Sequence, residues 1–417
     1  MSQQGRTRPL ICHVGLEESP YNPREVRAVL ASAERYDAVI IGPTTQTDAQ
    51  SPSAYKGIPV WLVKWRTRQG PKNLPFRLVK YAEFLIRTTW RARRLRADLI
   101  HAHALICLPS ALLAALGRKT KVIYDAYELY SEQGGPEHRQ GANFRFWMWL
   151  ERRLARRADA VIAANPERGE IMCRQLGLAE TPVSIDNLSE PLPRVESRLL
   201  QDFVASKGGS AEAIVFYQGM INENRGVPNL IAAMAHVPKG ISLVLMGPQH
   251  DPVVEPTVAR YGLQDRVFYH DPVPSGEVHA WSCSADAGVV IYRNTGLNNY
   301  LCAPNKLYQY LMSGIPVIGP DSPTVRRVLA DCGVGTMCDP ESPESIAKAI
   351  MDLLGDKASL ERARASIPKA LEKFNWQNEK ERLLGLYDRL LTAGTLGRAE
   401  RKDDSTESGG SSRNDRA

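Results

Sequence analysis

The chain alternates short apolar segments with longer helical segments, and it does so twice. In the first half, helical segments such as 24–34 and 109–116 separate the apolar segments. The apolar segments predicted as strands are 10–14, 38–41, 60–63, 99–101, 122–124 and 160–163. This order is typical of βαβ units that build a parallel sheet.

The alternation stops in residues 187–212, which are rich in Pro, Gly and Ser, and then starts again. The second set of predicted strands is 214–217, 242–246, 267–269, 288–291 and 316–318. A chain of 417 residues is too long for one ordinary core. We therefore expect an α/β fold with two tandem Rossmann-like doubly wound domains, 1–195 and 196–368. Helices follow at 369–395, and the polar residues 396–417 are expected to be a disordered tail.

One segment of the second domain, 304–321, predicts an anion site. It reads as a helix followed by a buried strand, with Asn305 capping the helix and Gly314 ending it in a left-handed turn. Lys306 falls in the first helical turn, where the positive end of the helix dipole disfavours a cation by about 0.3–1 kcal/mol. A bound phosphate would explain this placement, because helix N-termini and lysines both attract phosphate.

A second cation follows the first strand of the same domain. Arg225 lies in a loop between Gly219 and Gly226, beside the start of the next helix. Two cations at two strand-to-helix turns favour a shared diphosphate, although a solvated surface arginine is the simpler alternative. Gly247 ends another strand and could approach a ribose or base, or form a simple turn. Val267 starts a strand whose backbone could recognise a base edge.

In the first domain, His101 and His103 end one predicted strand and face the same side. Such a position suits His103 for proton transfer or hydroxyl binding, the alternative being a structural histidine. A metal site would need a third ligand that the sequence does not place, so no metal is expected. Arg24 follows the first strand and could hold an acceptor anion or lie at the surface. No Gly-rich fingerprint accompanies it, which argues against a dinucleotide cofactor.

Positive charge is concentrated in residues 64–97, which contain eleven basic residues, one acidic residue and five aromatic residues. We expect this segment to contact an anionic membrane surface, with a solvated helix face as the alternative. Nucleic acid is not expected, because no nucleic-acid motif accompanies the charge. The seven cysteines form no CxxC pair, and the N-terminus lacks a secretory signal. The expected location is therefore the cytoplasm, peripherally at the inner face of the membrane.

Residues 8–392 resemble the retaining glycosyltransferases of family 4, which have the two-domain GT-B architecture. The resemblance rests on a set of short motifs in a specific order, and on a C-terminal helix start at Phe374-Asn-Trp376 that implies a return to the first domain. The motifs are Asn22-Pro-Arg24, His101-Ala-His103, Tyr124-Asp-Ala-Tyr-Glu128, Gly219…Arg225-Gly226, Pro304-Asn305-Lys306-Leu and Gly314-Ile-Pro316-Val-Ile.

The resemblance implies transfer of a sugar from a UDP- or GDP-sugar to a lipid-linked or saccharide acceptor, in cell-surface polysaccharide or glycolipid synthesis. It implies no cofactor and no metal. The donor diphosphate would contact Arg225, Asn305, Lys306 and Gly219, and Gln309, Gly247 and Val267 would contact the ribose or base. His103 would be catalytic, and Arg24 and Glu128 would lie on the acceptor side.

The chain departs from the family pattern at several positions. Met220 stands where the family commonly has arginine, and Leu301 and Gln309 stand where it has paired glutamates. Ala104 and Tyr127 replace an aspartate and a histidine that are frequent in related motifs. These departures leave open a second hypothesis, a catalytically impaired GT-B partner of an active glycosyltransferase. A nucleotide-sugar epimerase would share the architecture, but no pair of cleft carboxylates supports it.

Overall fold

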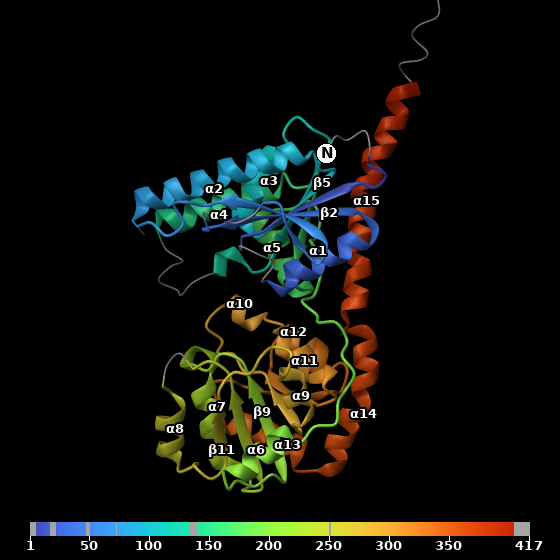
Figure 1. The fold of residues 1–417 in the computed structure, drawn as a ribbon. Helices are drawn as coiled ribbons and strands as arrows, with labels where there is room; N and C mark the ends of the chain where they lie inside the picture. Colours follow the sequence, from blue (N-terminus) through green and yellow to red (C-terminus); the bar gives the residue numbers. More distant parts are fainter. Residues whose placement is uncertain are drawn as a thin grey trace, which may run out of the picture. The chain divides into compact units, whose positions relative to one another are not determined.

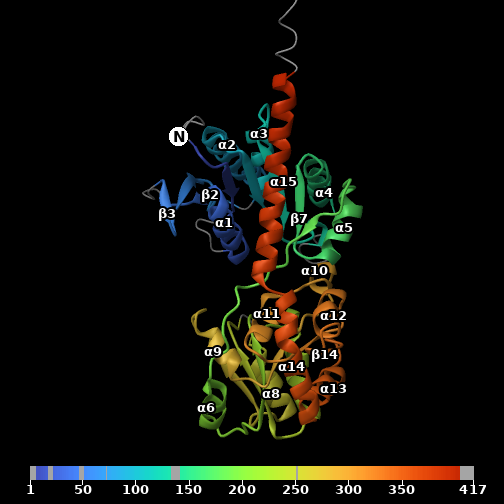
Figure 2. The same ribbon diagram turned by 90° about the vertical axis from the view of Figure 1, so that its right-hand side faces the viewer.

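The computed structural model describes residues 6–16, 22–46, 51–71, 73–132, 141–249 and 252–403. The chain forms two compact units, each built around a parallel sheet (Figures 1 and 2). Unit 1 comprises Met1–Tyr130, Gln140–Ile185 and Lys380–Ala417, and unit 2 comprises Ser131–Arg139 and Asp186–Glu379. The predicted fold class, two Rossmann-like α/β units in tandem, is confirmed.

The sheet of unit 1 has eight strands in the order β3-β4-β2-β1-β5-β6-β7-β8. Its strand pairs are parallel except for β3 with β4, which is antiparallel. The strands are β1 (Leu10–Val14), β2 (Asp37–Thr44), β3 (Ser53–Tyr55), β4 (Ile58–Lys64), β5 (Leu99–His103), β6 (Lys121–Ala126), β7 (Ala160–Ala163) and β8 (Val183–Ser184). The central strand β5 is buried over its whole length, as expected for a parallel sheet with covered faces.

Helices α2, α3 and α4 lie together on one face of this sheet, and α1 lies on the other (Figure 1). Asparagine caps start three of the helices of unit 1: Asn22, Asn73 and Asn165 each accept a backbone N–H of the first turn. The helices of unit 1 are α1 (Pro23–Arg35), α2 (Leu74–Leu95), α3 (Leu108–Ala115), α4 (Ala142–Ala155) and α5 (Pro166–Leu176), with a 3₁₀ turn η2 (Leu105–Cys107) before α3.

The sheet of unit 2 has six strands in the order β11-β10-β9-β12-β13-β14, and all of its pairs are parallel. The strands are β9 (Ala213–Gln218), β10 (Ile241–Met246), β11 (Val267–His270), β12 (Ala287–Val289), β13 (Val317–Pro320) and β14 (Gly335–Cys338). Apolar clusters cover both faces of the sheet. At Gly288 of β12 a Cβ would lie 2.3 Å from the ring of Tyr310, so only glycine fits there.

The helices of unit 2 connect these strands in βα order. They are α6 (Leu199–Ser206), η5 (Glu223–Arg225), α7 (Val227–Ala233), η6 (Met234–His236), α8 (Val254–Tyr261), α9 (Val278–Cys283), α10 (Leu297–Tyr300), α11 (Asn305–Met312), α12 (Pro323–Leu329), α13 (Pro343–Leu354) and α14 (Lys357–Lys373).

The last helix, α15 (Trp376–Asp403), begins in unit 2 and continues in unit 1. In unit 1 its Tyr387 packs edge-on against Tyr36, and its Lys380 donates to Glu34. The return of a C-terminal helix to the N-terminal unit is thereby confirmed. Residues 396–403 of the expected tail are helical, and 404–417 lie outside the described residues. None of the described helices combines the length and the apolar character that crossing a bilayer requires.

A buried acid in α4 makes the stability of unit 1 depend on pH. Glu151 is 3% exposed and accepts a hydrogen bond of 2.8 Å from the Tyr124 hydroxyl of β6. Burial raises the pKa of Glu151 from 4.5 to about 7. The folded protein therefore keeps a proton that the unfolded chain releases above its own pKa, and stability falls as pH rises through this window.

Replacing Glu151 by glutamine should remove this loss. Between pH 5 and pH 8, wild-type protein should lose about 2–3 kcal/mol of unfolding free energy relative to Glu151→Gln. Urea unfolding followed by tryptophan fluorescence measures the difference, with the exposed Glu128→Gln as the control that should follow wild type. Parallel pH profiles for wild type and Glu151→Gln would contradict the burial argument.

Candidate functional site

In unit 1, three histidines and one aspartate meet at the carboxyl ends of neighbouring strands. His13 of β1 pairs in register with His101 of β5, and His103 pairs with Asp125 of β6. All four side chains are at most 2% exposed. The rings of His101 and His103 stack with their centroids 4.1 Å apart, which confirms that they share a face. The His13 ring lies 5.3 Å from each of them.

The Asp125 carboxylate is held by a buried guanidinium. Arg24 at the start of α1 donates from Nε and Nη2 to Asp125, with the shortest contact 2.8 Å, and from Nη1 to the carbonyl of Ile185 at 2.7 Å. Burial alone would raise the pKa of Asp125, but the Arg24 guanidinium holds it well below its usual range. Asp125 is therefore charged, and it balances the charge of Arg24 inside unit 1.

The hydrogen bonds of Ser32 fix the tautomer of His13. The Ser32 hydroxyl donates to the carbonyl of Val29 at 2.7 Å, so its oxygen accepts from Nε2 of His13 at 2.9 Å. Burial, followed by the neighbouring histidines, lowers the pKa of His13 well below its usual value, so the ring is neutral. Nδ1 of His13 is then an acceptor, and Nε2 of His103, 3.0 Å away, must donate to it.

These bonds leave His103 with one free nitrogen. Burial, followed by His101, lowers the pKa of His103 to about 4, so the ring is neutral and its Nδ1 carries no proton. That nitrogen has no hydrogen-bond partner and lies 3.6 Å from Oδ2 of Asp125. A proton added at Nδ1 would face the carboxylate. The next residue, Ala104, has a φ of 75°, a strained conformation that often marks functional positions.

Three histidines with ligand atoms within 4.8 Å of one another could also hold a metal ion. The third ligand, which the sequence did not place, is His13. The direct hydrogen bond between His13 and His103 occupies two of the nitrogens, and the Arg24 guanidinium would repel a cation beside Asp125. The residues present therefore fit a hydrogen-bonded cluster better than a metal centre.

The two residues predicted for the acceptor side lie in different settings. Arg24 is 7% exposed and its guanidinium is paired with Asp125, so it is placed to orient the cluster. Glu128 is exposed, in the loop after β6. Between Asp125 and Glu128, Tyr127 places its ring 5.7 Å from the Arg24 guanidinium and 6.1 Å from the His103 ring.

In unit 2, the loops after β9 and β10 touch through two glycines. A Cβ on Gly247 would lie 2.1 Å from the carbonyl oxygen of Gly219, and the φ of Gly247, 146°, also requires glycine. A Cβ on Gly219 would lie 3.2 Å from Nζ of Lys306. Three of the predicted donor residues are thus brought together at one edge of the sheet.

Two cations converge at this edge. The Lys306 ammonium lies 3.9 Å from the centre of the Tyr217 ring, and both Lys306 and Arg225 lie over Tyr292, at 5.5 and 4.4 Å. Within the described residues, no carboxylate forms a salt bridge with either cation. Burial, followed by Arg225, lowers the pKa of Lys306 to about 7. An anion at this edge would relieve the repulsion between the two cations.

The start of α11 differs from the prediction. Pro304, and not Asn305, is the N-cap residue, and no side chain caps the helix. Asn305 is the first helical residue, and its Oδ1 accepts a hydrogen bond of 2.7 Å from Asn187. The first-turn N–H groups of α11 therefore remain without a side-chain cap, which suits an anion site. The left-handed turn at Gly314, with φ 72°, is as predicted.

The residues predicted for the ribose and base separate into two groups. Gln309 accepts a hydrogen bond of 2.8 Å from Nε2 of Gln218, at the end of β9. Val267 lies at the amino end of β11, opposite Leu243, and so away from the two glycines. The structure does not bring Val267 to this edge. His270 ends β11 there, and its carbonyl accepts from the N–H of Gly247 at 3.2 Å.

Comparison with known proteins identifies the family. Residues 22–185 match the family model "Glycosyl transferase 4-like domain", and residues 212–356 match "Glycosyl transferases group 1". The chain belongs to the group 1 glycosyltransferases of family 4. Its two parallel-sheet units are those of the GT-B fold.

Individual relatives are distant. The D-inositol 3-phosphate glycosyltransferase of Xylanimonas cellulosilytica is 23% identical over 251 residues, which is 57% of this chain and 58% of that protein. The match to the phosphatidyl-myo-inositol mannosyltransferase of Mycobacterium leprae is 28% identical and covers 22% of this chain and 27% of that protein. The chain thus spans less than two thirds of the length of these curated relatives.

Solved structures agree over almost the whole chain. Sucrose-phosphate synthase from Thermosynechococcus elongatus superposes with a TM-score of 0.72 at 18% identity, covering 93% of this chain and 100% of that one. The Anabaena protein HepE, solved with UDP-glucose, superposes with a TM-score of 0.68 at 17% identity, covering 91% and 99%. At sequence identities this low, the structural similarity establishes the fold.

Sequence reasoning missed several residues of the two clusters. His13 is as buried a strand residue as the apolar residues around it, and only the pairing of β1 with β5 reveals its partners. Asp125 is one residue of the motif that begins at Tyr124, and the sequence predicts no partner for it. Tyr217 of β9 and Tyr292, which follows β12, lie beneath the two cations, and nothing in the sequence around them indicates that role.

Removing the Arg24 guanidinium should destabilise the protein strongly. Arg24→Met leaves the Asp125 carboxylate buried without its main counter-charge, which costs about 3–5 kcal/mol. The exposed Arg35, which pairs with Glu381 and Asp388, provides the control, because Arg35→Met breaks ion pairs of comparable geometry in solvent. Urea unfolding compares the two variants, and equal losses would contradict a special role for the buried pair.

Proposed function

We propose that the protein is a retaining, hexosyl-type glycosyltransferase. It moves a sugar from a UDP- or GDP-sugar to a lipid-linked or saccharide acceptor, in the synthesis of a cell-surface polysaccharide or glycolipid. The observation that carries the proposal is the pair of cations in unit 2, which converge at a glycine edge without a carboxylate partner among the described residues.

The donor diphosphate would be held by Lys306, Arg225 and the uncapped N-terminus of α11, with Gly219 allowing close approach of the backbone. Negative charge develops on the diphosphate as the sugar leaves, and fixed cations at that point stabilise the transition state. This arrangement supplies positive charge from side chains, so the proposed reaction is metal-independent. The proposal of a nucleotide sugar is supported by HepE, whose structure was solved with UDP-glucose.

Gln309 and Gly247 are proposed to contact the ribose or base. A glutamine can accept one hydrogen bond and donate another, so Gln309 could bind a ribose hydroxyl after its bond to Gln218 rearranges. At the carboxyl end of β11 we propose the backbone of His270 as the base contact, since Val267 lies at the other end of that strand.

His103 is proposed as the catalytic residue of unit 1 and Glu128 as an acceptor contact. Proton acceptance at Nδ1 of His103 would be stabilised by Asp125, 3.6 Å away, and Arg24 would orient that carboxylate. The basic residues of 64–97 are proposed to place the enzyme peripherally at the cytoplasmic face of an anionic membrane. Five of the six cations of α2 are arginines, which suits phosphate headgroups.

A catalytically impaired GT-B partner is the second candidate function. Leu301 is 3% exposed and cannot supply the carboxylate expected at its position, and Met220 is 40% exposed beside Gly219. Purified protein incubated with UDP- and GDP-sugars separates the candidates. Donor hydrolysis or sugar transfer that is lost in His103→Ala supports the enzyme, whereas nucleotide binding without any turnover supports the partner.

Loss of either cation should weaken nucleotide binding. We expect Lys306→Ala and Arg225→Ala each to reduce the affinity for UDP or GDP by about 1.5–3 kcal/mol, the scale of hydrogen bonds to charged groups. Calorimetry with both nucleotides measures the loss and identifies the base. The exposed Lys239→Ala is the control within unit 2. Unchanged affinity in both cation variants would exclude the diphosphate site.

Nucleotide binding should also take up a proton. Free Lys306 has its pKa lowered to about 7, and a bound diphosphate would raise it again. At pH 8 binding should therefore take up a proton, approaching one per site, and affinity should fall as pH rises from 7 to 9. Calorimetry in buffers of different ionisation enthalpy measures the uptake. Equal uptake in Lys306→Met would show that another group binds the proton.

A further inference from the structure

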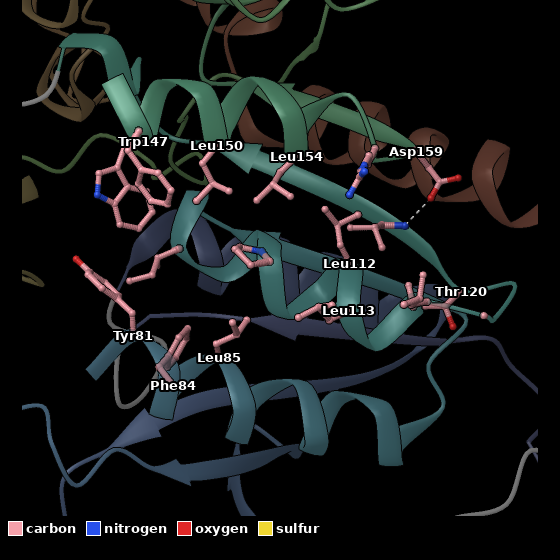
Figure 3. A pocket seen from close by; sticks show the side chains of 18 of the residues that line it. Tyr81, Phe84, Leu85, Leu112, Leu113, Thr120, Trp147, Leu150, Leu154 and Asp159 are labelled. Atoms are coloured by element: carbon pink, nitrogen blue, oxygen red, sulfur yellow. Dashed lines mark hydrogen bonds between the residues drawn. The ribbon is translucent and has the colours of Figure 1, made fainter. Parts of the chain in front are cut away.

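A large apolar groove lies in unit 1 between α2, α3 and α4. Its volume is about 830 Å³, within the range of small-molecule sites. Leu150 and Leu154 of α4 point into it from one side, and Leu112 and Leu113 of α3 line it from below (Figure 3). We call it the apolar groove.

The helices around the groove expose apolar side chains to an unusual degree. Leu78 of α2 is 62% exposed, and Leu113 and Leu116 at the end of α3 are 45% and 68% exposed. All three line the groove, as does Phe146 of α4, which is 51% exposed. An exposed apolar patch of this kind indicates a surface that binds a ligand or a partner.

A second pocket continues the groove toward the carboxyl edge of the sheet. It has a volume of about 430 Å³, and it shares Tyr81 and Ile106 with the apolar groove. Its described lining residues include three cations, Arg68, Arg77 and Lys80, and no acid. We call it the basic pocket.

The position of the basic pocket follows from the topology. Its residues Leu16, Trp65 and Ile106 come just after the ends of β1, β4 and β5. Ile106 lies in η2, three residues after His103. The basic pocket is thus at the edge of unit 1 at which His103 ends its strand, and the apolar groove runs from there to Thr120 and Asp159 near the amino ends of β6 and β7.

We infer that these two cavities bind one amphiphilic acceptor, a lipid whose hydrocarbon chain lies in the apolar groove and whose phosphate lies in the basic pocket. The hydroxyl that receives the sugar would then extend along the carboxyl edge. The inference rests on the proposed function in one respect, that unit 1 binds the acceptor, and it selects the lipid-linked acceptor over a free saccharide.

Charge and shape favour this occupant over a protein helix or a second copy of the chain. An amphipathic protein segment would place polar groups of both signs along its length, whereas the cavities separate an apolar section from a section lined by three cations. At the junction the Tyr81 ring meets the Trp147 ring edge-on, with centroids 5.4 Å apart. The hydrocarbon chain of a single lipid fits the apolar groove, and its phosphate fits the basic pocket.

Alkyl phosphates test the inference with the full-length protein. Dodecyl phosphate, at concentrations where it is monomeric, should bind and change the fluorescence of Trp147 and Trp65. Butyl phosphate and dodecanol, which lack the chain or the phosphate, should each bind at least about tenfold more weakly. Equal binding of dodecyl and butyl phosphate would overturn the apolar groove, and equal binding of dodecyl phosphate and dodecanol would overturn the basic pocket.

Adjacent exposed residues of α2 provide a matched pair of variants. Leu78 is 62% exposed and lines the groove, whereas Val79 is 50% exposed and does not. Leu78→Asp should weaken dodecyl phosphate binding about tenfold, and Val79→Asp less than twofold. Arg77→Ala should weaken binding several-fold, with Arg145→Ala of α4 as its control outside both pockets. Similar losses in Leu78→Asp and Val79→Asp would indicate a bilayer surface and overturn the inference.

Two further measurements separate the remaining outcomes. A dimer in sedimentation velocity that Leu78→Asp dissociates would identify a second copy as the occupant and overturn the inference. UDP binding in unit 2 should be unchanged in all four variants. If dodecyl phosphate fails to bind while UDP binds, the lipid site is wrong and the proposed function stands. If dodecyl phosphate binds and neither UDP nor GDP does, the proposed donor is wrong and the lipid site stands.

Discussion

Both units depend on one constraint, the parallel order of their strands. Because parallel strands all end at the same edge, residues far apart in the sequence are brought together without any long-range motif. His13 and His101 are neighbours across β1 and β5, and Gly219 and Gly247 touch across β9 and β10. The same rule brings Leu16, Trp65 and Ile106, which follow β1, β4 and β5, to one edge of the sheet, where they line the basic pocket.

The two clusters differ in their charge balance. In unit 1 the charges of Arg24 and Asp125 cancel, and the histidines are held by a chain of hydrogen bonds that ends at Ser32. These contacts hold His13, His103 and Asp125 in place at the strand ends, and Nδ1 of His103 is the nitrogen that they leave without a hydrogen-bond partner. In unit 2, Lys306 and Arg225 lie over aromatic rings with no carboxylate paired to them among the described residues, and burial lowers the pKa of Lys306. An anion at this edge would reduce the repulsion between the two cations.

Features governed by local sequence could be predicted, and features governed by pairing could not. The central strands, the turn at Gly314 and the placement of Lys306 in a first helical turn follow from nearest-neighbour preferences. His13 could not be assigned, because its partners are about 90 residues away and depend on strand order. Val267 was predicted wrongly for a different reason: it starts β11, whereas in a parallel sheet the carboxyl end of that strand, at His270, lies beside Gly247. Asn305 was predicted to cap α11, but it is the first helical residue and its Oδ1 accepts from Asn187, so the helix has no side-chain cap.

The basic segment 64–97 is not one uniform charged face. Arg91 and Arg94 stack on the rings of Trp61 and Trp90, at 4.4 and 3.7 Å, and Arg87 pairs with Glu83. Arg68, Arg77 and Lys80, nearer the start of α2, line the basic pocket instead. The positive charge that suggested a membrane is therefore divided between arginines toward the end of α2 and cations that line the basic pocket, before and near the start of that helix. Attachment to a surface and selection of an acceptor could then be altered separately, because different cations of the segment 64–97 would serve each.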